Sequence, residues 1–221
     1  MITEASLGIQ KSNARGEETR NRLLSVATEL FSEKGFAAVS TREIATAAET
    51  TLPSIPHHFG SKEGLYKAVL EAISDEMAKR LTLASKAAID VLGRKNASRT
   101  ERIQAIETLL STHARAMLEG KRSWAKLILL EELQPTEAFV PINQVLTEQV
   151  INPTVRLLTT LTAISVVDAK LKTISLLGRA VIFRIGRSSV LSLMGWDDLT
   201  PSRINKILDI LRAEIHASIG S

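Results

Sequence analysis

Residues 41–59 read TREIATAAETTLPSIPHHF, and this stretch decides the fold. It follows Ser40 and contains Glu43 three residues later, a capping-box pattern in which each side chain bonds the other residue's backbone amide. The pattern predicts a short helix from Thr41 to about Ala48. A three-residue turn and a second short helix, from about Leu52 to Phe59, complete the stretch. Two short helices joined by a tight turn are typical of a helix-turn-helix, whose second helix lies in the major groove of DNA.

The helix-turn-helix interpretation gives the second helix two faces. Ile55 and Phe59 would pack inside, and the opposite face would meet DNA. Lys62 begins the next helix, whose free amides and dipole attract phosphate. The residues expected to contact DNA are Thr41, Arg42, Thr51, Pro53, Ser54, His57, His58 and Lys62. The alternative is three packed helices of a bundle with no nucleic-acid role, and the spacing alone is compatible with both.

Apolar residues at helical spacing continue along the chain and predict an all-α protein of about nine helices. Residues 1–16 are polar and aperiodic, so a flexible arm is expected there. A helix from Glu17 would end at Gly35, in a left-handed cap. Later helices are predicted at 62–92, 99–118, 121–133, 136–163, 167–194 and 201–219.

Composition narrows the classes of protein. The 221 residues include no cysteine, which excludes disulfides and thiolate metal sites, and the longest apolar runs are too short for a membrane span. A cytoplasmic, nucleoid-associated protein without a membrane partner is therefore expected. The net charge is +4, yet the first 80 residues hold ten basic and eleven acidic side chains. DNA binding must therefore rest on local placement of charge.

The sequence also resembles a known family. TRNRLLSVATELFSEKGFAAVSTREIATAAE (19–49) and SIPHHFGSKEGLYKAVL (54–70) are similar to the DNA-binding domain of TetR-type transcriptional regulators. GSKEGLY, and EQVINP followed by an apolar helix ending LMGW, resemble the CecR-like subgroup. The resemblance implies a bacterial homodimeric repressor that binds palindromic double-stranded operator DNA and is released by a small-molecule effector. It divides the chain into an arm (1–16), a DNA-binding domain (17–65) and a helical ligand-binding and dimerisation domain (66–221).

Two positions depart from the family pattern. The family usually has glycine where Glu49 stands, and often an aromatic residue where Pro56 stands. A proline inside a regular helix removes a hydrogen bond and crowds the carbonyl four residues back, at a cost of about 3 kcal/mol. The second short helix is therefore expected to be irregular or 3₁₀-like.

Two further surfaces are predicted in the C-terminal part. Residues 167–194 are apolar around nearly the whole helix, and 201–219 carry one apolar stripe, which favours a four-helix dimer interface. The predicted interface residues are Leu176, Ile204, Leu208, Leu211 and Ile215. The predicted effector-binding residues are His113, Met117, Trp124, Leu127, Phe139, Phe183 and Arg184. The apolar majority of these favours an apolar or amphipathic effector. Arg184 needs a partner, either an anionic ligand or a carboxylate such as Glu131 or Glu132.

Other kinds of site find little support. Adjacent histidines diverge on a helix, so His57 and His58 cannot share a metal ion, and neither metal nor cofactor is expected. No triad order, phosphate loop or HExxH pattern indicates an enzyme. Glu131 with Glu132, and Asp197 with Asp198, are expected at solvent or near helix ends. Two alternatives remain: a helical dimer that has lost DNA binding and serves as a ligand-binding or interaction module, and an all-α enzyme with a buried acid–base pair.

Overall fold

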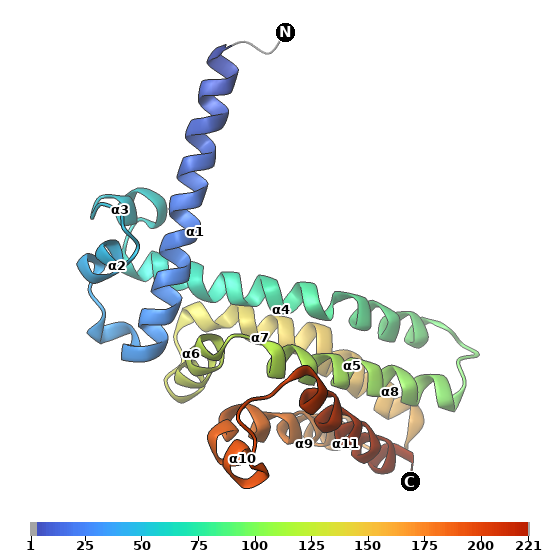
Figure 1. Cartoon of the computed structure of the whole chain (residues 1–221). Helices are drawn as coiled ribbons and strands as arrows, with labels where there is room; N and C mark the ends of the chain where they lie inside the picture. Colours follow the sequence, from blue (N-terminus) through green and yellow to red (C-terminus); the bar gives the residue numbers. More distant parts are fainter. Residues whose placement is uncertain (1–3, 221) are drawn as a thin grey trace. The chain divides into compact units, whose positions relative to one another are not determined.

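The computed structural model describes the backbone of residues 4–220 and the side chains of residues 14–219. Over this range the chain is all-α, as predicted, and contains eleven α-helices (Figure 1). They are α1 (Glu4–Ala38), α2 (Thr41–Ala47), α3 (Ser54–Phe59), α4 (Lys62–Gly93), α5 (Arg99–Glu119), α6 (Arg122–Leu133), α7 (Val140–Leu146), α8 (Asn152–Leu161), α9 (Val166–Ile185), α10 (Arg187–Met194) and α11 (Pro201–Gly220). A 3₁₀ turn, η1 (Glu137–Phe139), and a π turn, η2 (Thr147–Ile151), join the set. No described helix is long and apolar enough to cross a membrane.

The contacts divide the chain into two compact units. The first contains the chain up to Ile73 together with Arg122–Val140, and the second contains Ser74–Lys121 together with Pro141 onward. The chain therefore passes between the units three times: within α4, between α5 and α6, and at the start of α7. The domain boundaries at 16 and 65 stay predictions.

The first unit forms around the apolar face predicted for its first helix. Leu23, Ala27 and Phe31 of α1 are fully buried, as are Ile44 of α2 and Ile55 of α3. α1 packs against α2, α3 and α6. Three helices that could not bury an apolar stripe alone thus share one core.

Helix α1 differs from the prediction at its start. It begins at Glu4 rather than near Glu17, so residues 4–16 of the expected arm are helical, and residues 1–3 of that arm lie outside the described residues. Segment 4–16 contains no proline, and its Ala, Leu, Gln, Lys and Arg residues have high helix propensity, which offsets the low propensity of Gly8 and Gly16. At the other end, Gly35 has φ 77° and ψ 161°, which interrupts the helix at the predicted residue. The ψ angle is not that of the predicted left-handed cap, and α1 continues beyond the kink to Ala38.

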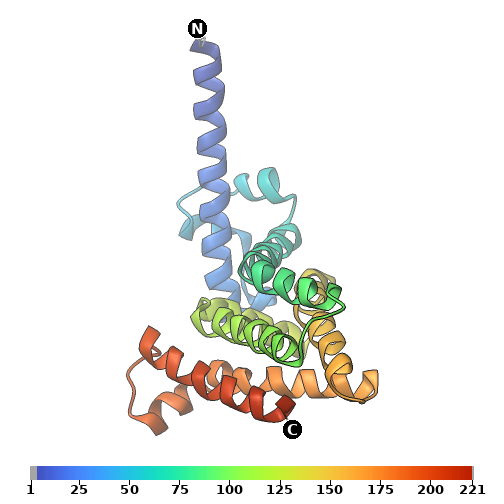
Figure 2. The same ribbon diagram turned by 90° about the vertical axis from the view of Figure 1, so that its right-hand side faces the viewer.

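The second unit is built around α5. This helix packs against α8, α9 and α11, and Figures 1 and 2 both show α9 and α11 running beside each other. One core cluster joins Ile106 and Leu109 of α5 to Leu157 of α8. A second joins Ala114 of α5 to Leu208 of α11. The central helix is therefore apolar on several sides.

Two long predicted helices are broken. Residues 136–163 form η1, α7, η2 and α8, and residues 167–194 form α9 and α10. Pro153 lacks an amide hydrogen and its ring would meet the carbonyl four residues earlier, so the turn before it widens to a π turn. Gly186 lies between α9 and α10, where a Cβ would come within 2.8 Å of the Ile182 carbonyl oxygen. Periodicity continues across both breaks and does not reveal them.

Candidate nucleic-acid interface

At the start of α2, one of the two hydrogen bonds of the predicted capping box forms. The Glu43 amide donates to the Ser40 hydroxyl at 3.1 Å. The Glu43 carboxylate instead accepts from the Lys34 ammonium at 2.5 Å. This ion pair lowers the pKa of Glu43, chiefly through the hydrogen bond from Lys34. A bond to a cation is stronger than one to a neutral amide, which explains why the carboxylate turns to Lys34.

The turn between α2 and α3 explains the family's preference for glycine. Glu49 has φ 49°, the one positive φ of a non-glycine residue among the described residues. A side chain in this conformation costs roughly 1–2 kcal/mol, a cost that glycine does not have. Hydroxyl groups also stabilise the turn. The hydroxyl oxygens of Thr50 and Thr51 lie 2.9 and 3.1 Å from that of Ser54, within hydrogen-bond distance.

With Pro56 inside it, α3 is still an α-helix, and the expectation of an irregular or 3₁₀-like helix is wrong. The helix begins at Ser54 rather than Leu52, which places Pro56 at its third position. The amides of the first turn have no partner within a helix, so the missing hydrogen costs little there. The preceding residues form tighter turns, with the Ser54 amide donating to the Thr51 carbonyl at 3.0 Å. The irregularity lies before the helix and not inside it.

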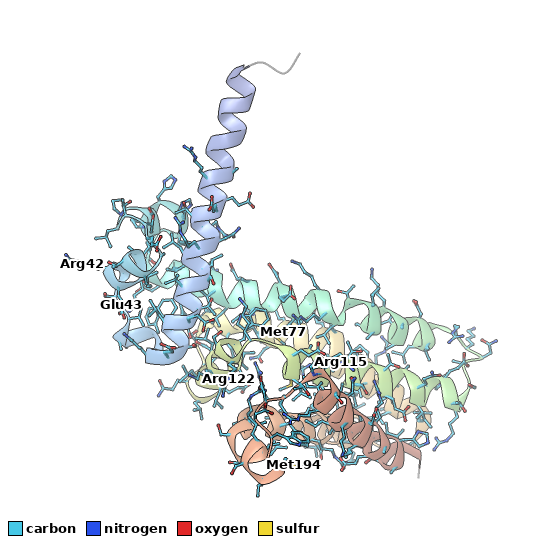
Figure 3. All side chains as sticks on the ribbon, in the orientation of Figure 1. Arg42, Glu43, Met77, Arg115, Arg122 and Met194 are labelled. Atoms are coloured by element: carbon cyan, nitrogen blue, oxygen red, sulfur yellow. The ribbon has the colours of Figure 1, made fainter. Side chains whose placement is uncertain are left out.

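The predicted DNA-contacting residues lie around α2, α3 and the start of α4, and none is fully buried. Arg42, Thr51, Pro53 and His57 are exposed. Thr41, Ser54, His58 and Lys62 are half-buried. Figure 3 shows Arg42 and Glu43 on α2. Ile55 is buried, as the register required, whereas Phe59 is only half-buried.

Lys62 is oriented by an aromatic cluster. Its ammonium lies 4.3 Å from the centroid of the Phe36 ring. That ring contacts Tyr66 at 5.0 Å and Phe31 at 5.8 Å between centroids. A cation over an aromatic face is attracted to it, and the bulky cluster limits where the Lys62 side chain can go. The cation is therefore held near the first turn of α4.

Sequence reasoning missed Arg20. This exposed residue of α1 places its guanidinium 5.2 Å from the centroid of Phe59 on α3. It also helps lower the pKa of His58, after burial and the neighbouring His57. Only packing brings a residue almost forty positions earlier beside α3, and its place on the polar face of α1 was the one available signal. Arg20 adds a cation to the surface formed by α2 and α3.

The predicted effector residues fall into both units. Trp124, Leu127 and Phe139 belong to the first unit, and His113, Met117, Phe183 and Arg184 belong to the second. Leu127, Phe139, His113 and Arg184 are buried, and the other three are half-buried. Their convergence on one ligand stays a prediction.

Two of the charged side chains have partners that the sequence did not indicate. Arg184 donates to the backbone carbonyls of Gly120 and Lys121 rather than needing a ligand for its hydrogen bonds. Glu131 and Glu132 both lie near the end of α6, as expected, but only Glu132 is exposed and Glu131 is buried. The Tyr66 hydroxyl donates to Glu131 at 2.6 Å. A tyrosine 65 positions earlier cannot be paired with Glu131 by spacing.

The predicted dimer-interface residues need correction. Their exposures within the single chain are small: Leu176 5%, Ile204 4%, Leu208 0%, Leu211 4% and Ile215 3%. The stripe on α11 is real, but it packs against α5 of the same chain. Exposed apolar residues lie instead along α9: Val167, Leu171, Ile174, Ile182 and Ile185. A periodic stripe shows that a helix is buried, and it does not show by which partner.

No group of three or more His, Asp or Glu side chains among residues 14–219 could hold a metal ion. Asp197 and Asp198 are exposed, as expected.

Comparison with known proteins identifies the family. Residues 23–69 match the model of the TetR family of bacterial regulatory proteins, and residues 121–221 match the C-terminal domain of the HTH-type transcriptional dual regulator CecR. The CecR regulator of Shigella flexneri is 30% identical over 193 residues, which cover 82% of each chain.

Solved structures agree on the fold. A TetR-like transcriptional regulator from Rhodococcus sp. RHA1 has a TM-score of 0.60 at 22% identity and covers 92% of this chain and 96% of its own. AibR, solved with isovaleryl coenzyme A and operator DNA, has a TM-score of 0.61 at 16% identity, with coverages of 90% and 97%. These relatives are regulators and not enzymes. The chain belongs to the TetR family of transcriptional regulators, is CecR-like, and carries its DNA-binding helix-turn-helix in α2 and α3.

Proposed function

We propose that the protein is a cytoplasmic, ligand-responsive repressor that binds palindromic operator DNA as a homodimer. The observation that carries the proposal is the surface of α2 and α3, where Arg42 and His57 are exposed and the Arg20 guanidinium lies over Phe59 of α3. Lys62, at the start of α4, adds a cation that lies over the Phe36 ring. Phosphate contacts from the cations would position the protein, and polar side chains of α2 and α3 would read bases.

The test is selection of bound sequences from random duplex DNA with the full-length protein. The proposal expects a palindrome whose half-sites lie one helical turn apart, about 34–36 Å, as dimeric helix-turn-helix proteins require. Lys62→Ala should then weaken the selected site and random DNA alike, because a phosphate contact carries no sequence information. Failure to enrich any sequence would favour a helical dimer that has lost DNA binding.

The dimer is proposed to form through α9. Val167, Leu171, Ile174, Gly178, Ile182 and Ile185 share one face at helical spacing, and the apolar members are each more than half exposed. Gly178 leaves open space where a Cβ would lie, which permits a close helix approach. Such a contiguous apolar face marks an interaction site, and a twofold axis lets the same face serve both copies.

Release by an effector requires unequal binding to two states. A small molecule must bind the free dimer more tightly than the operator complex, and linkage demands the same factor in both directions. AibR was solved in complex with isovaleryl coenzyme A and operator DNA, which supports the proposal that this chain also binds a small molecule and an operator. The test is to titrate a candidate effector against tryptophan fluorescence and operator affinity together. Saturable binding that leaves operator affinity unchanged would show a ligand site without regulation.

A further inference from the structure

A cleft of about 660 Å³ lies wholly within the first unit. The end of α1, the first turn of α4, the end of α6 and the segment leading into η1 form its walls. Phe36, Leu130 and Leu133 supply apolar surface, and Leu133 is 70% exposed. None of the residues predicted to bind the effector lines this cleft.

Glu131 places a buried carboxylate on the wall of the cleft. It is 2% exposed. One oxygen accepts from the Tyr66 hydroxyl at 2.6 Å, and the other accepts from the amide and the hydroxyl of Thr136, both at 2.9 Å. All three donors are neutral. Among side chains 14–219 no lysine or arginine forms an ion pair with Glu131, although a buried charge is stable mainly when it is paired.

The remaining charges of the cleft are also unbalanced. Lys34 is engaged by Glu43 at 2.5 Å, and Lys67 lies 3.8 Å from Glu71, and neither of these carboxylates lines the cleft. Glu63 and Glu137 line it and are exposed, and the neighbouring Lys62 is a cation that acts on Glu63. Burial, and then the bond to Glu131, raise the pKa of Tyr66, so the tyrosine stays a neutral donor. The cleft therefore combines an apolar wall with two carboxylates, those of Glu131 and Glu137, that form no ion pair with a side chain of residues 14–219.

We propose that this cleft binds a small amphipathic organic cation. Its ammonium group would lie toward Glu131, and its apolar body would cover Phe36, Leu130 and Leu133. Phe36 also lies beneath the Lys62 ammonium, so the occupant would contact the residue that orients a DNA-binding cation. This site is separate from the effector site proposed above.

The test is calorimetric titration of full-length protein, without DNA, with three ligands of equal length: octylammonium, octanol and octanoate. Octylammonium is expected to bind at least about tenfold more tightly than octanol, the worth of one hydrogen bond to a buried charge, and octanoate most weakly. Glu131→Gln keeps the shape and the acceptor oxygen but removes the charge, and should abolish the tenfold advantage. Glu132→Gln, on the exposed neighbour outside the cleft, should leave all three affinities unchanged.

A second variant covers the case in which Glu131→Gln fails to fold, as judged by circular dichroism. Leu133→Ser changes an exposed lining residue and should weaken octylammonium and octanol by the same factor. Equal binding of octanoate and octylammonium would overturn the proposal, as would an equal loss in Glu131→Gln and Glu132→Gln. Since DNA is absent, the result is independent of operator binding, and failure of either proposal is seen without the other.

Discussion

At the scale of single residues, burial of His113 on α5 sets a pH dependence of stability. Burial lowers the pKa of His113 to about 4, from its ordinary value of 6.5, and its Nδ1 atom has no hydrogen-bond partner among the described residues. Between pH 6.5 and 4, His113 is protonated in the unfolded chain but stays neutral in the folded chain. The free energy of unfolding should therefore fall between pH 6.5 and 4, by about 3 kcal/mol in total.

Urea titrations across that range check the prediction. His113→Leu removes the titrating group. The fall in the free energy of unfolding between pH 6.5 and 4 should therefore be smaller in this variant by about 3 kcal/mol. His57→Gln, at an exposed position, should retain the slope of the wild type. An unchanged slope in His113→Leu would show that other groups cause the acid sensitivity.

Glu49 allows strain and charge to be separated. Glu49→Gly should raise the free energy of unfolding by up to about 1 kcal/mol, because glycine relieves the positive φ but also gains entropy in the unfolded chain. Glu49→Gln keeps the strained backbone and should leave stability unchanged. Both variants should bind DNA more tightly, because each removes a negative charge near the phosphates. Denaturant unfolding and DNA titrations of the two variants provide the comparison.

At the scale of elements, the position at which α3 begins decides the effect of Pro56. Because Pro56 is the third residue of the helix, Pro56→Ala should restore no needed hydrogen bond. It should lower the free energy of unfolding by less than about 1 kcal/mol, since alanine frees the unfolded chain. A gain approaching the roughly 3 kcal/mol of an interior proline would mean that α3 begins earlier.

The matched control is a proline placed inside a long helix. Ala72 is an exposed residue in the interior of α4, so Ala72→Pro should destabilise by about 3 kcal/mol or more. Chemical denaturation of both variants under one condition measures the contrast.

At the scale of the whole molecule, the assembly prediction concerns the exposed face of α9. Ile174 is 56% exposed in the single chain, so Ile174→Glu should leave the helical content intact. It should abolish the dimer by placing two charges at a twofold contact, and operator affinity should fall with it. Sedimentation at micromolar concentration and circular dichroism report the two properties separately.

Leu208→Glu provides the contrasting case. Leu208 is fully buried against α5, so a carboxylate there should unfold the second unit rather than yield a folded monomer. A wild-type protein that sediments as a monomer, or a dimeric Ile174→Glu variant, would refute the assignment of the dimer face to α9.

The sequence by itself determined the helical class, the helix-turn-helix, the Ser40 cap and the inward position of Ile55, because these depend on spacing within one segment. It also marked Glu49 and Pro56 as unusual. It could not decide that Glu43 turns to Lys34, that Arg20 lies beside Phe59, or that Glu131 is buried against Tyr66. Those contacts join residues far apart in the chain, so only tertiary packing creates them.

The partner of an apolar stripe was also decided by the tertiary structure alone. Periodicity shows that one face of α11 is buried. The same apolar stripe would result whether that face packs against α5 of the same chain or against α9 of a second copy. Periodicity also could not reveal the helix breaks near Pro153 and Gly186. The apolar spacing continues across both breaks, although the backbone hydrogen bonds change there. Local spacing thus determines which residues are buried, and the three-dimensional packing of distant segments determines against what.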